Sequence, residues 1–191
     1  MVTGIILASA SPRREQLLRQ VGYEFQVLPS RAEEDNTAEL PPEELVQTHA
    51  RAKAWDVARQ VAPADIVIGA DTLVVLDGKV FGKPGSAEQA CRMLQELSGR
   101  THSVWSGIAI VKEGRCLCEA VETRVTLGCL NEEEIKRYVA TGEPLDKAGA
   151  YAVQGIGAVF VEKLDGCYFN VVGLPLNALS RLLSEAGVDL L

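Results

Sequence analysis

The sequence predicts an α/β protein built around a mixed sheet. Apolar, β-rich runs alternate with amphipathic helical patterns through the first half, which is typical of parallel strands with crossover helices. Two long β-rich runs joined by a short connection follow near residue 100, and they indicate an antiparallel hairpin. With 191 residues, of which 47% are hydrophobic, the chain is long enough to bury a sizeable core.

The elements of the first half follow from the hydrophobic periodicity. We expect, in order, a strand at 4–7, a helix at 12–21, a strand at 24–28 and a long helix at 42–61. A buried strand at 65–68 leads into Gly69-Ala70-Asp71-Thr72, so Asp71 is predicted to stand at a strand end. An apolar run at 73–76 then reaches Asp77-Gly78, a strong hairpin signal.

The second half has clear cap and turn signals. Ser86 is a good N-cap, and Gln89 three residues later predicts a capping box for a helix ending near residue 97. Asn131 is predicted to cap a short helix. The remaining expected elements are strands at 101–111, 115–127 and 159–164 and helices at 132–140 and 176–186.

No Pro/Ser-rich linker interrupts the chain. We therefore predict a single domain over 1–191, with two lobes dividing near 99–101, where strands begin to dominate, and a cleft between them.

Composition narrows the function classes. The net charge of −7 argues against a broad face for a nucleic-acid polymer, because such binding depends on many Lys and Arg contacts. No apolar run approaches eighteen residues, and the first basic pair follows rather than precedes the apolar stretch, so neither a membrane span nor a signal peptide is expected. Five cysteines without C-x-x-C spacing favour a reducing compartment. We expect a cytoplasmic protein.

The first candidate site is Ser9-Ala10-Ser11-Pro12-Arg13-Arg14, where a buried strand gives way to a helix with Pro12 at its first position. Free N–H groups and the helix dipole favour an anion there, and arginine recognises phosphate oxygens in a bidentate manner. A capped helix with solvated arginines is the alternative. The local pattern does not choose between them.

The second candidate is a set of carboxylates. Glu33, Glu34 and Asp35 share a loop, and Asp71 follows the buried strand at 65–68. Ligands usually gather at strand ends in open α/β sheets, and Mg²⁺ uses one or two protein carboxylates together with substrate phosphates. Asp71 is therefore a candidate metal ligand or general base, although a solvated acidic loop and a turn-capping aspartate explain the same pattern.

Two lysines stand where a cation needs a partner. Lys53 falls on the apolar stripe of the 42–61 helix, so we expect it either to snorkel under a loop or to line a cleft beside phosphates. Lys83 lies between Gly82 and Pro84, which can aim its side chain from a constrained loop.

Other site types find little support. The segment 143–157 mixes small residues with Asp146, Lys147 and Gln154, but its glycines lack the dinucleotide fingerprint, which disfavours NAD. His49 and His102 lack metal-ligand spacing, and no Ser-His-acid relay is evident. Neither histidine is therefore assigned a role.

Taken together, several blocks resemble the signatures of the Maf family, in the right order and across nearly the whole chain. They are LASASPRR from Leu7, ARAKA from Ala50, GADT from Gly69, GKP from Gly82, EPLDKAGAYAVQGIG from Glu143 and NVVGLPL from Asn170.

The resemblance implies an elongated fold similar to the inosine-triphosphate pyrophosphatases, frequent dimerisation, and hydrolysis of a nucleoside triphosphate to its monophosphate and pyrophosphate, assisted by Mg²⁺ or Mn²⁺. It implies that Asp71 is the proton acceptor or metal-linked base, and that Glu34, or else Glu33, adds a second acidic group at the metal. The residues expected to contact the substrate are Ser9, Arg13, Arg14, Glu34, Lys53, Lys83, Asp146 and Lys147.

Within the family, Arg13, Thr72 and Gln154 match the branch resembling dTTP and UTP pyrophosphatases. Thr72 and Gln154 are then expected to read a pyrimidine edge through hydrogen bonds. Two alternatives stay open: a nucleotide-binding regulator of cell division and septum formation that acts through a partner, and a hydrolase that removes only the terminal phosphate.

Overall fold

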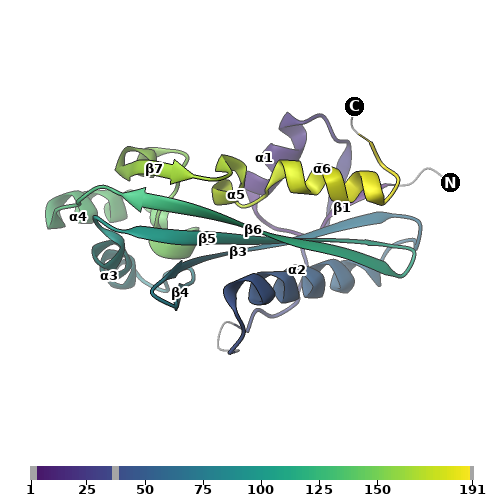
Figure 1. Cartoon of the computed structure of the whole chain (residues 1–191), viewed down its shortest axis with the longest axis horizontal. Coiled ribbons are helices and arrows are strands. Elements are labelled where there is room, and N and C mark those ends of the chain that lie inside the picture. Colours follow the sequence, from purple (N-terminus) through teal and green to yellow (C-terminus); the bar gives the residue numbers. More distant parts are fainter. Residues whose placement is uncertain (1–3, 36–38, 190–191) are drawn as a thin grey trace. The chain divides into compact units, whose positions relative to one another are not determined.

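The computed structural model of the chain describes residues 4–35 and 39–189 and is a mixed α/β structure (Figure 1). Its strands are β1 Ile5–Leu7, β2 Phe25–Val27, β3 Ile66–Leu76, β4 Lys79–Phe81, β5 Thr101–Lys112, β6 Arg115–Leu127 and β7 Val161–Asp165. Its α-helices are α1 Pro12–Gln20, α2 Pro42–Ala58, α3 Ala87–Leu97, α4 Glu132–Ala140, α5 Tyr168–Val172 and α6 Leu176–Glu185. Three short 3₁₀ helices are η1 Glu143–Asp146, η2 Ala148–Ala150 and η3 Ile156–Phe160.

The seven strands form one sheet, which confirms the predicted fold class. The strand order is β2-β1-β3-β5-β6-β7, with β4 paired to β3. β1 lies parallel to both β2 and β3, whereas β4 is antiparallel to β3 and β7 is antiparallel to β6. The parallel part is the βαβ portion predicted from the alternating pattern.

The chain divides into two compact units. The first contains residues 1–71, 106–121 and 173–191, and the second contains 72–105 and 122–172. The predicted division near 99–101 lies inside the second unit, and the single domain with two lobes stays a prediction.

The core of the first unit is built from small and branched side chains of β1, α2, β3 and β5. Ala50, Ala54 and Val57 on α2 are fully buried against Val67 and Ala109. Figure 1 shows α2 on one face of these strands and α1 and α6 on the other. Alanine at the contact lets a helix approach a sheet closely, which is decisive for the candidate site.

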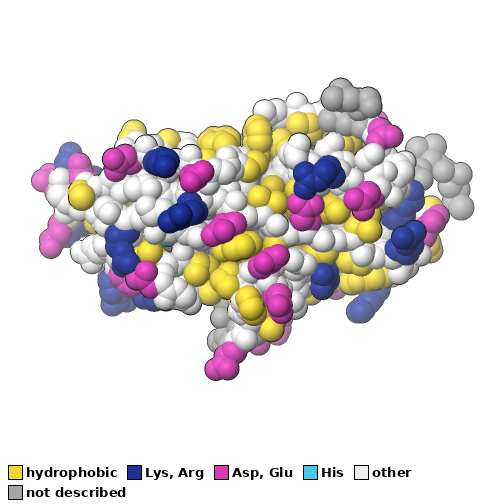
Figure 2. Space-filling model, in the orientation of Figure 1, with side chains coloured by type: hydrophobic (Ala, Val, Ile, Leu, Met, Phe, Trp, Pro, Cys, Tyr) yellow, Lys and Arg dark blue, Asp and Glu magenta, His cyan; other side chains and the backbone are white. Residues whose placement is uncertain are grey.

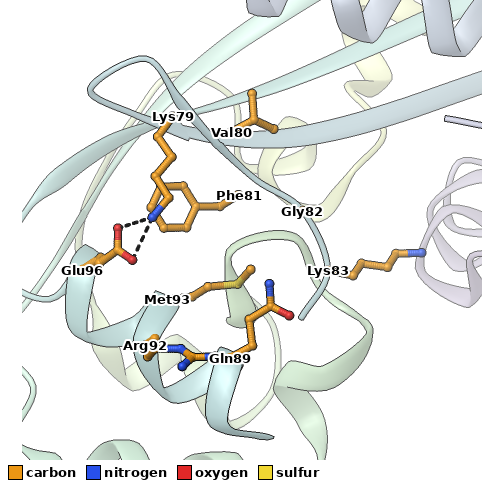
Figure 3. A pocket seen from close by; sticks show the side chains of 9 residues that line it. All are labelled: Lys79, Val80, Phe81, Gly82, Lys83, Gln89, Arg92, Met93 and Glu96. Atoms are coloured by element: carbon orange, nitrogen blue, oxygen red, sulfur yellow. Dashed lines mark hydrogen bonds and ion pairs between the residues drawn. The ribbon is translucent and has the colours of Figure 1, made fainter. Parts of the chain in front are cut away.

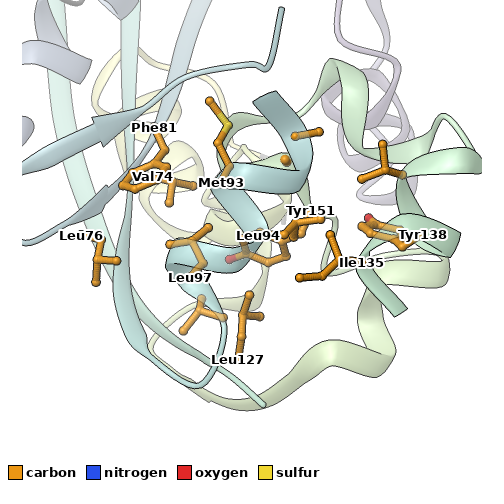
Figure 4. Close-up of a cluster of buried hydrophobic side chains, with 14 of the residues drawn as sticks. Val74, Leu76, Phe81, Met93, Leu94, Leu97, Leu127, Ile135, Tyr138 and Tyr151 are labelled. Carbon is orange, nitrogen blue, oxygen red and sulfur yellow. The ribbon is translucent and has the colours of Figure 1, made fainter. Parts of the chain in front are cut away.

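The second unit has larger core side chains, many of them drawn in Figure 4. Leu94 and Leu97 of α3 and Ile135 and Tyr138 of α4 meet strand residues such as Leu127. Burying a leucine-sized side chain contributes about 1.5–3 kcal/mol, so this cluster stabilises the unit that carries the 143–157 segment.

The turn at Asp77-Gly78 and the cap at Asn131 are formed as the sequence predicts. Asp77 and Gly78 both have positive φ, at 50° and 78°, as the predicted two-residue hairpin requires. Asn131 forms a complete capping box with Glu134. At α3 the prediction was half right: Ser86 accepts from the Gln89 amide, but the Gln89 side chain accepts from Gly85 N rather than from Ser86 N.

The predicted strand end at Asp71 was wrong. β3 continues without a break from Ile66 to Leu76, so Asp71 lies within the strand. β1 pairs with the first residues of β3, 66–68, whereas the rest of β3 continues beside β5 and pairs with β4 at residues 74–76. Asp71 therefore lies beyond the carboxyl end of β1 although its own strand continues.

Candidate active site

Two glycines allow α2 to lie close to the sheet. A Cβ at Gly69 would clash with the Ala50 carbonyl oxygen and would stand 2.7 Å from Ala54 N. A Cβ at Gly107 of β5 would likewise meet the backbone of Val46 and Gln47. Side chains alternate along a strand, so Asp71 shares with Gly69 the face of β3 that α2 covers. The close approach brings α2 within hydrogen-bonding distance of Asp71.

Asp71 is held by two side chains of α2. Its Oδ1 accepts from Lys53 Nζ at 2.7 Å, and its Oδ2 accepts from His49 Nδ1 at 2.9 Å. His49 and Lys53 are four residues apart and so lie on one face of the helix. Asp71 is only 4% exposed. Each oxygen of the buried Asp71 carboxylate therefore has a side-chain hydrogen-bond partner, Lys53 for one and His49 for the other.

These contacts set the protonation of the pair. Burial by itself would raise the pKa of Asp71, but the hydrogen bond from His49 and the ammonium of Lys53 outweigh it and lower that pKa well below its usual range. The hydrogen bond to Asp71 raises the pKa of His49, although burial opposes the shift. His49 Nε2 also faces an acceptor, the Asp35 carbonyl oxygen at 3.3 Å, so acceptors at both ring nitrogens favour the imidazolium.

Lys53 joins a second carboxylate to the site. Besides Asp71, its ammonium contacts Glu34 Oε1 at 2.5 Å and the Ala70 carbonyl oxygen at 3.3 Å, which gives each of its three donors an acceptor. Glu34, rather than Glu33, therefore faces Lys53. The prediction that Lys53 on the apolar stripe needs a partner is met by two carboxylates.

The Ser9–Arg14 segment packs against the same strand. Arg14 donates to the carbonyl oxygens of Gly173, at 2.8 Å, and Ala70, at 3.0 Å, and to Ser9 Oγ, at 3.2 Å. Ser9 Oγ also accepts from Ser11 N. Arg14 thus joins the start of α1 to β3 and to the segment before α6, and it shares the Ala70 carbonyl with Lys53. Arg13 is half-buried on the first turn of α1.

The other predicted substrate residues belong to the second unit, and their place in one site stays a prediction. Lys83 is exposed in the loop after β4. Lys147 donates to Asp146 and to the Glu143 carbonyl oxygen, both at 2.6 Å. Thr72 follows Asp71 on β3, so its side chain points to the opposite face of the strand. Gln154 is half-buried.

A cavity of about 360 Å³ lies in the second unit between β4 and α3. Figure 3 shows Lys79 paired with Glu96 beside Phe81, whereas Lys83 points away from the other lining residues. Because none of the residues around Asp71 lines this cavity, it is not the predicted carboxylate site.

Asp71 and Glu34 fit a divalent cation such as Mg²⁺, which takes few of its ligands from the protein. Asp71 and Glu34 both contact one ammonium, so two carboxylates converge on one point. No group of three or more His, Cys, Asp or Glu suited to a metal occurs in the part of the chain that the structure describes. Two oxygen donors are what Mg²⁺ takes from protein when phosphates and water complete its shell.

One face of the surface and the lengths of the helices bear on the expectations from composition. On the face drawn in Figure 2, acidic and basic side chains are interspersed. Among residues 4–35 and 39–189, no helix has the length and apolarity needed to cross a membrane.

His49 was missed by the sequence reasoning. An isolated histidine carries no metal-ligand pattern, and its partner Asp71 is 22 residues away. The available signal was its helical position: His49 precedes Lys53 by one turn and adjoins Ala50 on the buried stripe. Two ionisable groups on one buried face indicate a common buried partner.

The family follows from comparison with known proteins. Residues 4–186 match the family model described as Maf, Maf-like protein. The chain belongs to the Maf family.

Curated relatives match the Maf-like chain over almost its full length. A dTTP/UTP pyrophosphatase of Moorella thermoacetica is 52% identical, covering 97% of this chain and 96% of the relative. Proteins of the same name from Gloeobacter violaceus and Dictyoglomus thermophilum are 51% and 48% identical; the coverage is 97% of both chains for the first and 98% of both for the second.

Solved structures show weaker similarity. The Staphylococcus aureus Ham1 protein aligns with TM-score 0.47 at 15% identity, over 65% of this chain and 72% of that protein. A nucleoside-triphosphatase / dITP/XTP pyrophosphatase of Mycobacterium abscessus aligns with TM-score 0.43 at 13% identity, over 96% and 98%. Similarity at this level indicates nothing about the reaction of the Maf-like chain.

Proposed function

We propose that this Maf-family chain is a nucleoside triphosphate pyrophosphatase that hydrolyses dTTP and UTP to the monophosphate and pyrophosphate. The observation that carries the proposal is the buried Asp71 carboxylate, held by Lys53 and His49, with Glu34 on the same ammonium. Relatives 48–52% identical over nearly the full length are named dTTP/UTP pyrophosphatases, which supports the reaction and the substrates.

Asp71 and Glu34 would hold Mg²⁺ or Mn²⁺ together with substrate phosphates. Bound there, the ion would neutralise phosphate charge and lower the pKa of a coordinated water. Lys53, already between the two carboxylates, would turn its ammonium toward the phosphates, because a cation placed near developing negative charge lowers the barrier.

The protonation state of Asp71 bears on its role. A general base works best when its pKa lies near the operating pH, whereas the pKa of Asp71 is held far below that. Asp71 therefore suits a permanently ionised ligand that orients water better than it suits a free proton acceptor. His49 keeps the carboxylate ionised and fixes its orientation.

Ser9, Arg13, Arg14 and Lys83 are proposed to contact the triphosphate, with Asp146 and Lys147 beside it. Through its contacts with two carbonyl oxygens and Ser9, Arg14 also holds the segment that carries Arg13. Lys83 is exposed and forms no ion pair with any described residue, so its ammonium is available to an anion. Thr72 and Gln154 are proposed to read the pyrimidine base. A cytoplasmic homodimer is the proposed setting.

The proposal is tested by incubating the purified chain and Mg²⁺ with dTTP, UTP, dCTP, dATP and dGTP and resolving the products. We expect monophosphate and pyrophosphate, fastest from dTTP and UTP. Diphosphate with orthophosphate would instead support removal of the terminal phosphate. Tight nucleotide binding without any product would favour the regulator of cell division.

A further inference from the structure

The side chain of Glu143 binds the backbone of the loop that carries Gln154. Its Oε2 accepts from Ile156 N at 3.0 Å and its Oε1 accepts from Gly157 N at 2.9 Å. Burial opposes ionisation, but the two amide donors and Tyr138 outweigh it and lower the pKa of Glu143, so the side chain stays a carboxylate at neutral pH. A charged acceptor makes these bonds stronger than neutral ones.

Tyr138 fastens the other end of the same loop. Its hydroxyl donates to Glu143 Oε1 at 2.9 Å and accepts from Ala152 N at 3.1 Å. The ring is 2% exposed and meets Phe160 edge-to-face, with centroids 5.0 Å apart. The carboxylate is therefore anchored to the core of the second unit, shown around Tyr138 in Figure 4.

The loop backbone is shaped around this carboxylate. Gly155 has φ 78° and ψ −148°, a conformation essentially confined to glycine. A Cβ at Gly155 would clash with Glu143 Oε2 and stand 3.1 Å from its Cδ. A Cβ at Gly157 would stand 2.7 Å from the Ala152 carbonyl oxygen. Because glycine has no Cβ, these two positions leave room for the contacts of Glu143 and Tyr138 with the loop.

Gln154 lies midway between the two fastened points, two residues after Ala152 and two before Ile156. Its side-chain amide makes no hydrogen bond to any residue that the structure describes, although the backbone on both sides is fixed. An uncommitted amide on a fixed backbone is suited to read a ligand edge, because little ordering is needed on binding.

We propose that Glu143, together with Tyr138, is a positioning residue for base selection, which holds the 152–157 loop so that Gln154 presents its amide to the pyrimidine. This rests on the proposed function, in which Gln154 reads the base. Glu143 contacts the loop backbone and acts on the nucleotide only through it.

The experiment compares Glu143→Gln and Tyr138→Phe with the unmodified chain. A glutamine turns one accepting oxygen into a donor that faces a loop N–H, and the phenylalanine keeps the buried ring without its hydroxyl. Binding of the α,β-imido analogues of dTTP and dGTP is measured by calorimetry, and KM and kcat are measured for dTTP. Glu162→Gln, an exposed carboxylate of β7, is the matched charge control.

We expect the preference for the dTTP analogue to fall about tenfold in Glu143→Gln, less than the roughly 100-fold that an ångström of misplacement can cost. KM for dTTP should rise with little change in kcat, because the lost contact concerns the base rather than the reacting phosphates. Tyr138→Phe should shift the preference in the same direction, and Glu162→Gln should not. A variant with general structural damage would bind both analogues more weakly by the same factor, so its preference for the dTTP analogue would not change.

Two results would overturn the inference: a folded Glu143→Gln with the unmodified preference, or an unmodified chain that binds both analogues equally. Should Glu143→Gln fail to fold, Tyr138→Phe decides by the same criterion. If the unmodified chain prefers the dTTP analogue but releases no pyrophosphate, the proposed function fails while the binding ratios still decide the inference.

Discussion

Gly69→Ala would separate α2 from β3 at the candidate active site. The new Cβ would clash with the Ala50 carbonyl oxygen and would stand 2.7 Å from Ala54 N. Ordinary contact begins near 3.4 Å, so helix and strand must open by at least about 0.7 Å. His49 and Lys53 would move with the helix away from Asp71. Overpacking of this kind costs about 1–3 kcal/mol, which for a chain of this size lowers Tm by about 2–12 °C.

The change in turnover should be larger than the change in stability suggests. A misplacement approaching 1 Å at a catalytic group can cost on the order of 100-fold, so we expect a loss of about 10- to 100-fold in kcat for dTTP at a temperature where the variant is folded. Thermal unfolding and a pyrophosphate-release assay measure the two effects. Gly128→Ala is the control, because its Cβ would meet only the Phe160 carbonyl oxygen, at 3.9 Å. Unaltered Tm and kcat in Gly69→Ala would refute this reasoning.

Three further changes probe the same cluster. Lys53→Met keeps the stem but leaves Asp71 and Glu34 without their ammonium; we expect about 3 kcal/mol lower stability in urea unfolding, the low end for a broken buried pair, and at least about 100-fold lower kcat. Undiminished turnover in Lys53→Met would show that Lys53 has no role in the reaction. The raised pKa of His49 stabilises the fold below its unfolded value of 6.5 and stops doing so as pH rises through the folded value. The stability gap to His49→Gln should therefore be wider at pH 6 than at pH 9, and a constant gap would exclude the imidazolium. Arg14→Lys cannot reproduce the fork to Gly173, Ala70 and Ser9, so we expect about 1–3 kcal/mol of destabilisation, and unchanged urea unfolding would argue against the anchoring role.

What the sequence predicted well was local. Asp77-Gly78 and the Asn131 cap act through their own backbone and near neighbours, so composition at fixed offsets is enough. Lys53 was singled out because a charge on an apolar stripe needs a partner, and the structure supplies Asp71 and Glu34.

What the sequence missed depends on tertiary contacts. Asp71 looked like a strand end because the apolar run pauses there, but pairing with β5 and β4 continues the strand. His49 gains its role only because Gly69 allows α2 to approach β3, and no spacing rule connects residues 49 and 71. The contacts of Glu143 likewise follow from tertiary structure, because the backbone amides that it binds lie more than ten residues away in the sequence.

The measurement that tests the central claim most directly is product-resolved hydrolysis of dTTP by Asp71→Asn beside the unmodified chain. The variant can keep its fold, because His49 can release its Nδ1 proton and accept from the new amide while Lys53 still donates to the remaining oxygen. We predict folded protein whose release of pyrophosphate falls at least about 100-fold. Folded Asp71→Asn that releases pyrophosphate at the unmodified rate would contradict the account.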